Sequence, residues 1–111
     1  MKIAIPVKNN KLCNHFGHCE QFYICETDDS KAIIKHELIT PPPHEPGLLP
    51  RWLGEKHVEL IISGGMGQRA KSLFEERNIQ VCVGAPPLPP EILVGKYLNN
   101  ELTYGSNTCD H

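Results

Sequence analysis

Four side chains of metal-binding type lie within seven positions near the start of the chain, in the stretch "LCNHFGHCEQF". They are Cys13, His15, His18 and Cys19. A thiolate is a soft ligand that suits iron–sulfur clusters, copper(I) or zinc, and an imidazole suits zinc, iron and copper. The spacing predicts a metal-ligating segment. A buried cysteine beside surface histidines explains the same residues without a metal.

Two further places in the chain carry residues of the same kind. The last residues read "NTCDH", and in an extended tail Cys109 and His111 point to the same side. The alternative for this tail is a frayed terminus. His44 lies in the proline-rich stretch "TPPPHEPG", whose restricted backbone would pre-position a ligand. The alternative for His44 is a solvated loop histidine. We expect both places to meet the early segment around a metal.

The cysteine spacing does not match a regular structural zinc site. Ribbon and finger sites use cysteines separated by two to four residues and paired with a second such group, whereas Cys13 and Cys19 are six positions apart. This spacing favours an open site whose metal exchanges over a permanent structural zinc. Cys25 and Cys82 lie inside apolar runs and are predicted to be core residues, because a buried thiol packs like a small hydrophobe.

The stretch "SGGMGQRA" follows an apolar run and precedes an amphipathic one. In an open α/β sheet, ligands bind at the carboxyl ends of the strands. The amino end of a helix also offers unpaired N–H groups to anions. Gly64, Gly65, Met66 and Gly67 are therefore candidate ligand-binding residues, either for a phosphate or for an anionic metal–sulfur cluster. A tight strand-to-helix turn uses glycine in any case, so this signal is weak alone.

Size and charge place the chain in a broad class. Its 111 residues predict one domain over 1–111, and a net charge of −2 gives no reason to expect nucleic-acid or membrane binding. The chain has no apolar run of about 18 residues that would span a membrane, and "MKIAIPV" does not read as a signal peptide. We expect a cytoplasmic protein whose five cysteines stay mostly reduced. The sequence does not indicate an oligomeric state.

The hydrophobic pattern predicts an α/β domain with a five-stranded mixed sheet, antiparallel in its first half and parallel in its second. Residues 9–11 read as a turn after the first strand. The predicted strands cover residues 2–7, 21–27, 32–39, 58–63 and 79–84, and the predicted helices cover 48–57, 69–77 and 91–100.

Enzyme chemistry finds little support in the residues. The chain has no G-x-S-x-G nucleophile elbow and no paired carboxylates. A thiol nucleophile at Cys19, beside His15 or His18, lacks an identified orienting group. The glycine stretch matches neither the P-loop nor the dinucleotide fingerprint.

Four segments together resemble the dinitrogenase iron–molybdenum cofactor biosynthesis family, which includes NifX, NafY and the C-terminal part of NifB. They are "HFGHCEQF", "PPPHEPGLLPRWL", "LIISGGMGQRAKSLFEERNIQV" and the closing "CDH". The resemblance implies a ribonuclease H-like, three-layer α/β/α fold. It also implies a protein without enzymatic activity that binds, carries or protects an iron–sulfur or iron–molybdenum-type cluster and exchanges it with a donor or acceptor protein.

The resemblance extends to particular positions. Residues 64–67 match the family's strand-to-helix signature, and His15, Phe16 and Gly17 match its H-F-G stretch. A subgroup of short members is richer in cysteine and histidine, and the residues typical of it here are His18, Cys19, His44, Cys109 and His111. Their role as ligands is inferred from chemistry. Two alternatives stay open: a regulatory or interaction module with a zinc or redox-responsive site, and an enzyme acting on a phosphorylated small molecule at the glycine stretch.

Overall fold

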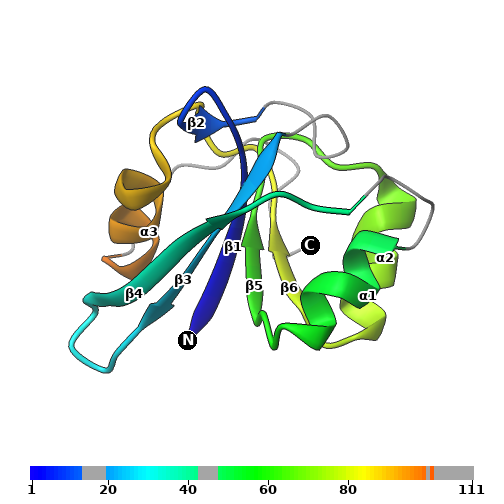
Figure 1. Ribbon diagram of the computed structural model, residues 1–111, viewed down its shortest axis with the longest axis horizontal. Helices are drawn as coiled ribbons and strands as arrows, with labels where there is room; N and C mark the ends of the chain where they lie inside the picture. The colour runs from blue at the N-terminus through cyan, green and yellow to red at the C-terminus, as the bar shows by residue number, and fades with distance from the viewer. Residues whose placement is uncertain (14–19, 43–47, 100, 102–111) are drawn as a thin grey trace.

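The sheet is organised around one buried apolar strand, "KIAIPVK", near the amino terminus. The computed structural model describes residues 1–13, 20–42, 48–99 and 101. Its strands are β1 (Lys2–Lys8), β2 (Lys11–Leu12), β3 (Gln21–Thr27), β4 (Ile33–Ile39), β5 (Leu60–Ile62) and β6 (Gln80–Cys82). The order across the sheet is β4-β3-β1-β5-β6, with β2 attached to β1 (Figure 1).

The pairing confirms the predicted mixed sheet. β1, β3 and β4 pair antiparallel, whereas β1, β5 and β6 pair parallel. The strand number differs from the prediction, because the described residues form six strands rather than five. The additional strand, β2, follows a two-residue turn in which Asn9 and Asn10 have φ angles of 55° and 64°. Positive φ at both positions is the backbone that joins hairpin strands tightly. Two residues are too few to show an alternating pattern, which is why the sequence did not reveal β2.

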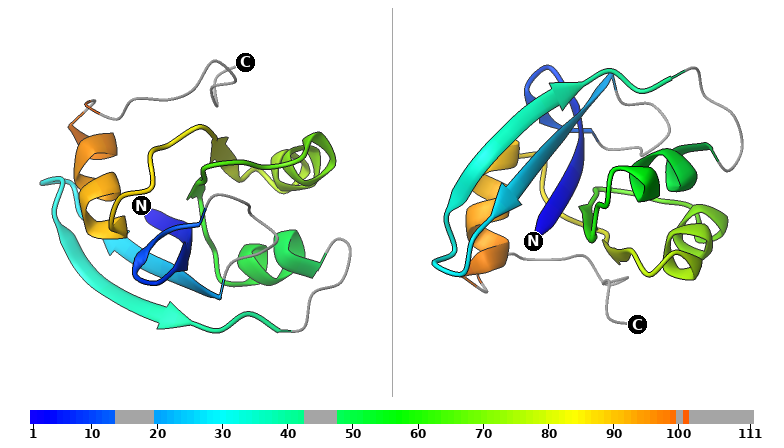
Figure 2. Two further views of the ribbon diagram at one scale, coloured as in Figure 1. Left: turned by 90° about the horizontal axis from the view of Figure 1, so that it is seen from above. Right: turned by 60° about the horizontal axis from the view of Figure 1, so that its bottom comes forward.

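Helices cover both faces of the sheet. They are α1 (Leu48–Glu55), α2 (Gln68–Glu76) and α3 (Pro90–Leu98). The ribbon views place α3 on one face and α1 with α2 on the other (Figures 1 and 2). None of the helices in the described ranges has the length and apolar character needed to cross a bilayer.

Alternation along the strands divides the apolar side chains into two cores. Ile3 and Ile5 of β1 pack on the α3 side with Leu93, and all three are fully buried. Ala4, between them in the sequence, packs on the other side with Leu53 of α1 and the other residues of that core. Successive side chains of a strand point to opposite faces, so β1 contributes to both layers.

The parallel strands bring several loops to one edge of the sheet. β1, β5 and β6 end at Lys8, Ile62 and Cys82, and we call this the carboxyl edge. Because β3 and β4 alternate in direction, β3 begins and β4 ends at the same edge. Helix α3 begins near the carboxyl edge and runs back towards the opposite edge, where β1 starts (Figure 1).

Candidate functional site

The glycine loop, residues 63–67, leaves the carboxyl edge between β5 and α2. Ser63 is completely buried, and its backbone N–H donates to the Cys82 carbonyl at 2.7 Å. Its hydroxyl donates to the Gly65 carbonyl at 3.1 Å. This side-chain bond closes a local turn that fixes the start of the loop.

A second loop, residues 83–89 between β6 and α3, is bonded to the glycine loop. The Gly84 N–H donates to the Gly64 carbonyl at 2.9 Å, and the Ala85 N–H donates to the Ser63 carbonyl at 3.2 Å. Gly84 has a φ of 84°, a left-handed backbone that residues with a side chain rarely adopt. The two loops therefore form one backbone-bonded unit at the carboxyl edge.

Cys13 lies at the same edge. Its backbone N–H donates to the Pro6 carbonyl at 2.9 Å, and its side chain is buried, with 7% exposed. Its neighbour Leu12 donates to the Leu88 carbonyl at 3.0 Å, which ties the β1–β2 hairpin to the second loop. On the other side of residues 14–19, the Glu20 N–H donates to the Val7 carbonyl at 3.1 Å. The described residues that flank the early cluster are thus both held at the end of β1.

The amino end of α2 gives the glycine loop its electrostatic character. The helix begins after Gly67, and no side chain caps its first N–H groups. The first turn carries no acidic residue and includes the exposed Arg69. Unpaired N–H groups and the positive end of the helix dipole favour a negatively charged ligand. The space beside Gly67 is open, because a Cβ built there meets no atom within 4 Å.

The sequence predicted Met66 of this loop as a site residue but did not predict Ser63. Met66 is half-buried and packs against the core beneath α1 and α2, as a hydrophobic wall would. Ser63 was not predicted as a site residue, although its hydroxyl shapes the loop. The available signal was a serine placed directly between an apolar strand and two glycines.

Most of the predicted metal ligands lie outside the described residues. This applies to His15, His18, Cys19, His44, Cys109 and His111. The described ranges alone contain no group of three or more His, Cys, Asp or Glu side chains arranged to hold a metal ion. The structure therefore brings together Cys13 and the glycine loop at one edge, and the six remaining candidates stay predictions.

The end of α3 bears on the predicted role of the tail. The Glu101 N–H donates to the Lys96 carbonyl at 2.7 Å, so the chain is still attached to the last turn of α3 at that point. That turn lies towards the edge opposite the glycine loop (Figure 1). A tail that supplies Cys109 and His111 to the carboxyl edge has to run the length of the sheet.

A separate cavity of about 280 Å³ lies between β4 and the start of α3. Tyr23, His36, Leu38 and Pro90 are among the residues that line it. Tyr23 is 2% exposed, and its hydroxyl has no hydrogen-bond partner among the described residues. The Tyr23 and His36 rings stack with centroids 5.5 Å apart. None of these residues was predicted to belong to a site, because an aromatic residue in a strand normally indicates core packing.

Comparison with known proteins gives a consistent set of relatives. The family model described as dinitrogenase iron-molybdenum cofactor matches residues 1–100. The protein MJ0580 of Methanocaldococcus jannaschii is 33% identical over 87 residues, which cover 73% of this chain and 72% of that protein. The crystal structure of PH0822 superposes with a TM-score of 0.88 at 21% identity, covering 96% of both chains. The apo form of the orange protein of Desulfovibrio gigas superposes with a TM-score of 0.72 at 15% identity, covering 96% of this chain and 94% of that one. At such identities the two solved structures show a shared fold.

Proposed function

The chain belongs to the dinitrogenase iron-molybdenum cofactor family, and on that premise we propose that it binds, carries or protects a metal cluster. The cargo is an iron–sulfur-based or molybdenum-containing cluster. The role is that of a non-enzymatic, cytoplasmic accessory protein in metallocofactor assembly, performed by a single domain over residues 1–111. The partners are a cluster donor and a cluster acceptor.

The observation that carries this proposal is the meeting of Cys13, the glycine loop and the uncapped start of α2 at one edge. Cys13 is held there by the bond to Pro6, and the glycine loop by the bond from Gly84. Such an edge offers a thiol together with backbone N–H groups. Metal–sulfur clusters are bound by thiolates and carry negative charge on their sulfides, so they need both kinds of group.

Two other segments with predicted ligands connect described residues near this edge. Residues 14–19 join Cys13 to Glu20, and both of these are bonded to the end of β1. Residues 43–47, which include His44, join the chain that leaves β4 to the start of α1. We propose His15, His18, Cys19 and His44 as ligands on this basis.

The tail ligands carry an additional geometric requirement. Cys109 follows Glu101 by eight residues, which span at most about 26–29 Å when fully extended. The seven residues of β1 are about 23 Å long. Cys109 reaches the carboxyl edge only when the tail runs nearly straight, and His111 has two more residues of reach, so we rank both below the other candidates.

We also propose that the architecture is ribonuclease H-like without nuclease activity, since fold does not fix function. Its support is the mixed sheet, antiparallel in one half and parallel in the other, with helices on both faces.

Anaerobic reconstitution with ferrous iron and sulfide tests the proposal. The expected result is a coloured protein with sulfide-to-iron absorption that weakens when Cys19 becomes Ser. Cys25→Ala is the matched control, because Cys25 is 1% exposed in the core and its loss should leave the colour unchanged. A colourless protein with or without Cys19 would refute the proposal, and tight stoichiometric zinc instead would favour a regulatory zinc module.

A further inference from the structure

β4 is an edge strand of the sheet, and its side chains are unusually exposed to solvent for a segment that contains four apolar residues. Among the residues that the structure describes, it pairs with β3 on one side and with no strand on the other. Every residue from Ile34 to Leu38 is exposed, with Ile34 at 64% and Leu38 at 48%. The outer side of an edge strand presents N–H and C=O groups that can pair with another strand.

We propose that two copies of this chain pair through β4, antiparallel, about a two-fold axis that passes beside His36. In this register the numbers of two residues that face each other add up to 72. Lys35 therefore lies opposite Glu37 of the partner subunit. Leu38 of the partner subunit then lies at the level of Ile34, where β4 shifts its register against β3. The segment "IIKHELI" is therefore self-complementary in charge, because Lys35 and Glu37 face each other twice across the two-fold axis.

The charged face of β4 already continues a row of alternating charge across the sheet. Lys2 of β1 lies opposite Glu26 of β3, and Glu26 lies opposite Lys35 of β4. The row ends at the open edge on a positive charge. Pairing with a second copy would place Glu37 of the partner subunit next in the row.

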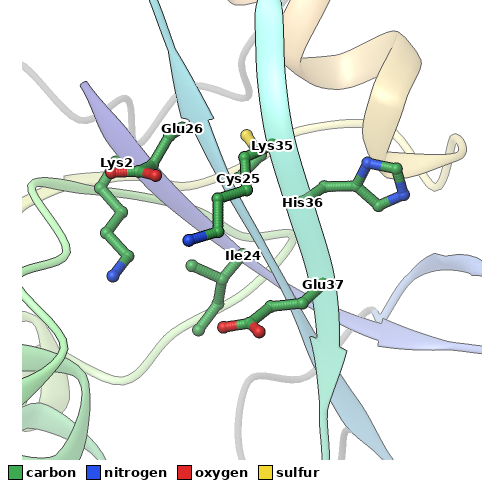
Figure 3. A pocket seen from close by; sticks show the side chains of 7 residues that line it. All are labelled: Lys2, Ile24, Cys25, Glu26, Lys35, His36 and Glu37. Atoms are coloured by element: carbon green, nitrogen blue, oxygen red, sulfur yellow. The ribbon is translucent and has the colours of Figure 1, made fainter.

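Figure 3 shows how the two faces of β4 differ. Lys35 and Glu37 lie on the side shared with Lys2 and Glu26, whereas the His36 ring points to the other side, towards α3. Leu38 shares the side of His36, because side chains alternate along a strand. The register against β3 shifts between Ile33 and Lys35, so this alternation does not carry on to the exposed Ile34. Pairing would cover the exposed Leu38 side chain, which supplies a driving force that the charges alone do not provide.

The proposed dimer is isologous, because the same strand contributes to both halves of the interface. Antiparallel pairing sends the two carboxyl edges to opposite ends of the joined sheet. Each subunit then keeps a complete glycine loop of its own, so this proposal stands independently of the cluster-binding role.

Sedimentation equilibrium of the full chain tests the dimer. We expect concentration-dependent dimerisation that Glu37→Lys weakens roughly tenfold or more, because each of two symmetric pairs changes from attraction to repulsion. Lys35→Glu should do the same. An equimolar mixture of the two variants should dimerise again, since in the mixed pair every charge at position 35 faces the opposite charge at position 37.

Controls separate the interface from the fold. Glu75→Lys reverses an exposed charge on α2 and should leave the dimer unchanged. Thermal melts should show that each variant is folded. A wild-type chain that stays monomeric at high concentration would overturn the proposal. A dimer that survives both single reversals would also overturn it, because the interface would then lie elsewhere.

Discussion

Tyr23 and Cys25 are two titratable side chains that β3 buries on the same face of the sheet. Burial raises the pKa of Cys25 from 9.0 to about 11, although a backbone hydrogen bond from Ile3 acts in the opposite direction. Burial also raises the pKa of Tyr23 from 10.0 to about 12, and the neighbouring Cys25 and Glu91 add to the increase. Both groups therefore stay neutral in the folded protein at pH values where the unfolded chain has already lost their protons.

Stability is predicted to fall at alkaline pH for this reason. Cys25 loses its proton near pH 9.0 when unfolded and near pH 11 when folded, so its contribution is complete below pH 9.0 and disappears as pH rises through that window. Urea unfolding under reducing conditions at several pH values measures the slope. Cys25→Ala should start from a lower stability, because it leaves a small void, and should lose less of it between pH 9 and 11. A variant curve parallel to the wild-type curve would contradict this assignment.

Single residues were predictable where their environment followed from the local pattern. Cys25 and Cys82 were predicted to be core residues from the apolar runs around them, and they are 1% and 0% exposed. Ser63 was not predicted to shape the site, because its role depends on the position of the Gly65 carbonyl. A one-dimensional pattern does not contain that position.

At the scale of elements, the predicted helices and long strands are all present, with ends shifted by a few residues. The largest changes are in the two parallel strands predicted over 58–63 and 79–84, which form only Leu60–Ile62 and Gln80–Cys82. Hydrogen bonds to a neighbour decide where a strand ends, and hydrophobicity does not report them. The glycine loop was predicted from its place after an apolar run, but its bond to Gly84 follows from the parallel order of β5 and β6.

Two glycines at the carboxyl edge predict opposite outcomes for the same substitution. Gly84 has a φ of 84°, so Gly84→Ala should destabilise the fold by about 1–3 kcal/mol. Gly67 has a φ of −66° and open space around it, so Gly67→Ala should cost less than about 1 kcal/mol. Thermal or urea unfolding of both variants measures the difference.

The same two variants, Gly84→Ala and Gly67→Ala, separate an effect on the stability of the fold from an effect on ligand binding. The methyl group of Gly67→Ala would occupy the space through which a ligand approaches the first amides of α2, so reconstitution should yield less cluster in a stable protein. Equal loss of stability in the two variants would contradict the backbone assignment. Full cluster loading of Gly67→Ala would contradict the role of the α2 amino end.

At the scale of the whole molecule, topology explains why distant segments share one edge. The turn to parallel pairing after β4 places the loops after β1, β5 and β6 side by side, although they are separated by tens of residues. The sequence predicted the mixed sheet but not the direction in which α3 runs along it. That direction places the start of the tail near the far edge, which is why the early cluster and His44 are stronger candidates than Cys109 and His111.

The most direct test of the central claim is the metal content of untagged protein purified without oxygen, measured by elemental analysis together with acid-labile sulfide. A cluster carrier should contain several iron atoms per loaded chain, with sulfide, molybdenum or both. Protein that holds one zinc and no iron or molybdenum, or no metal even after purification from iron- and molybdenum-replete cells, would contradict the account.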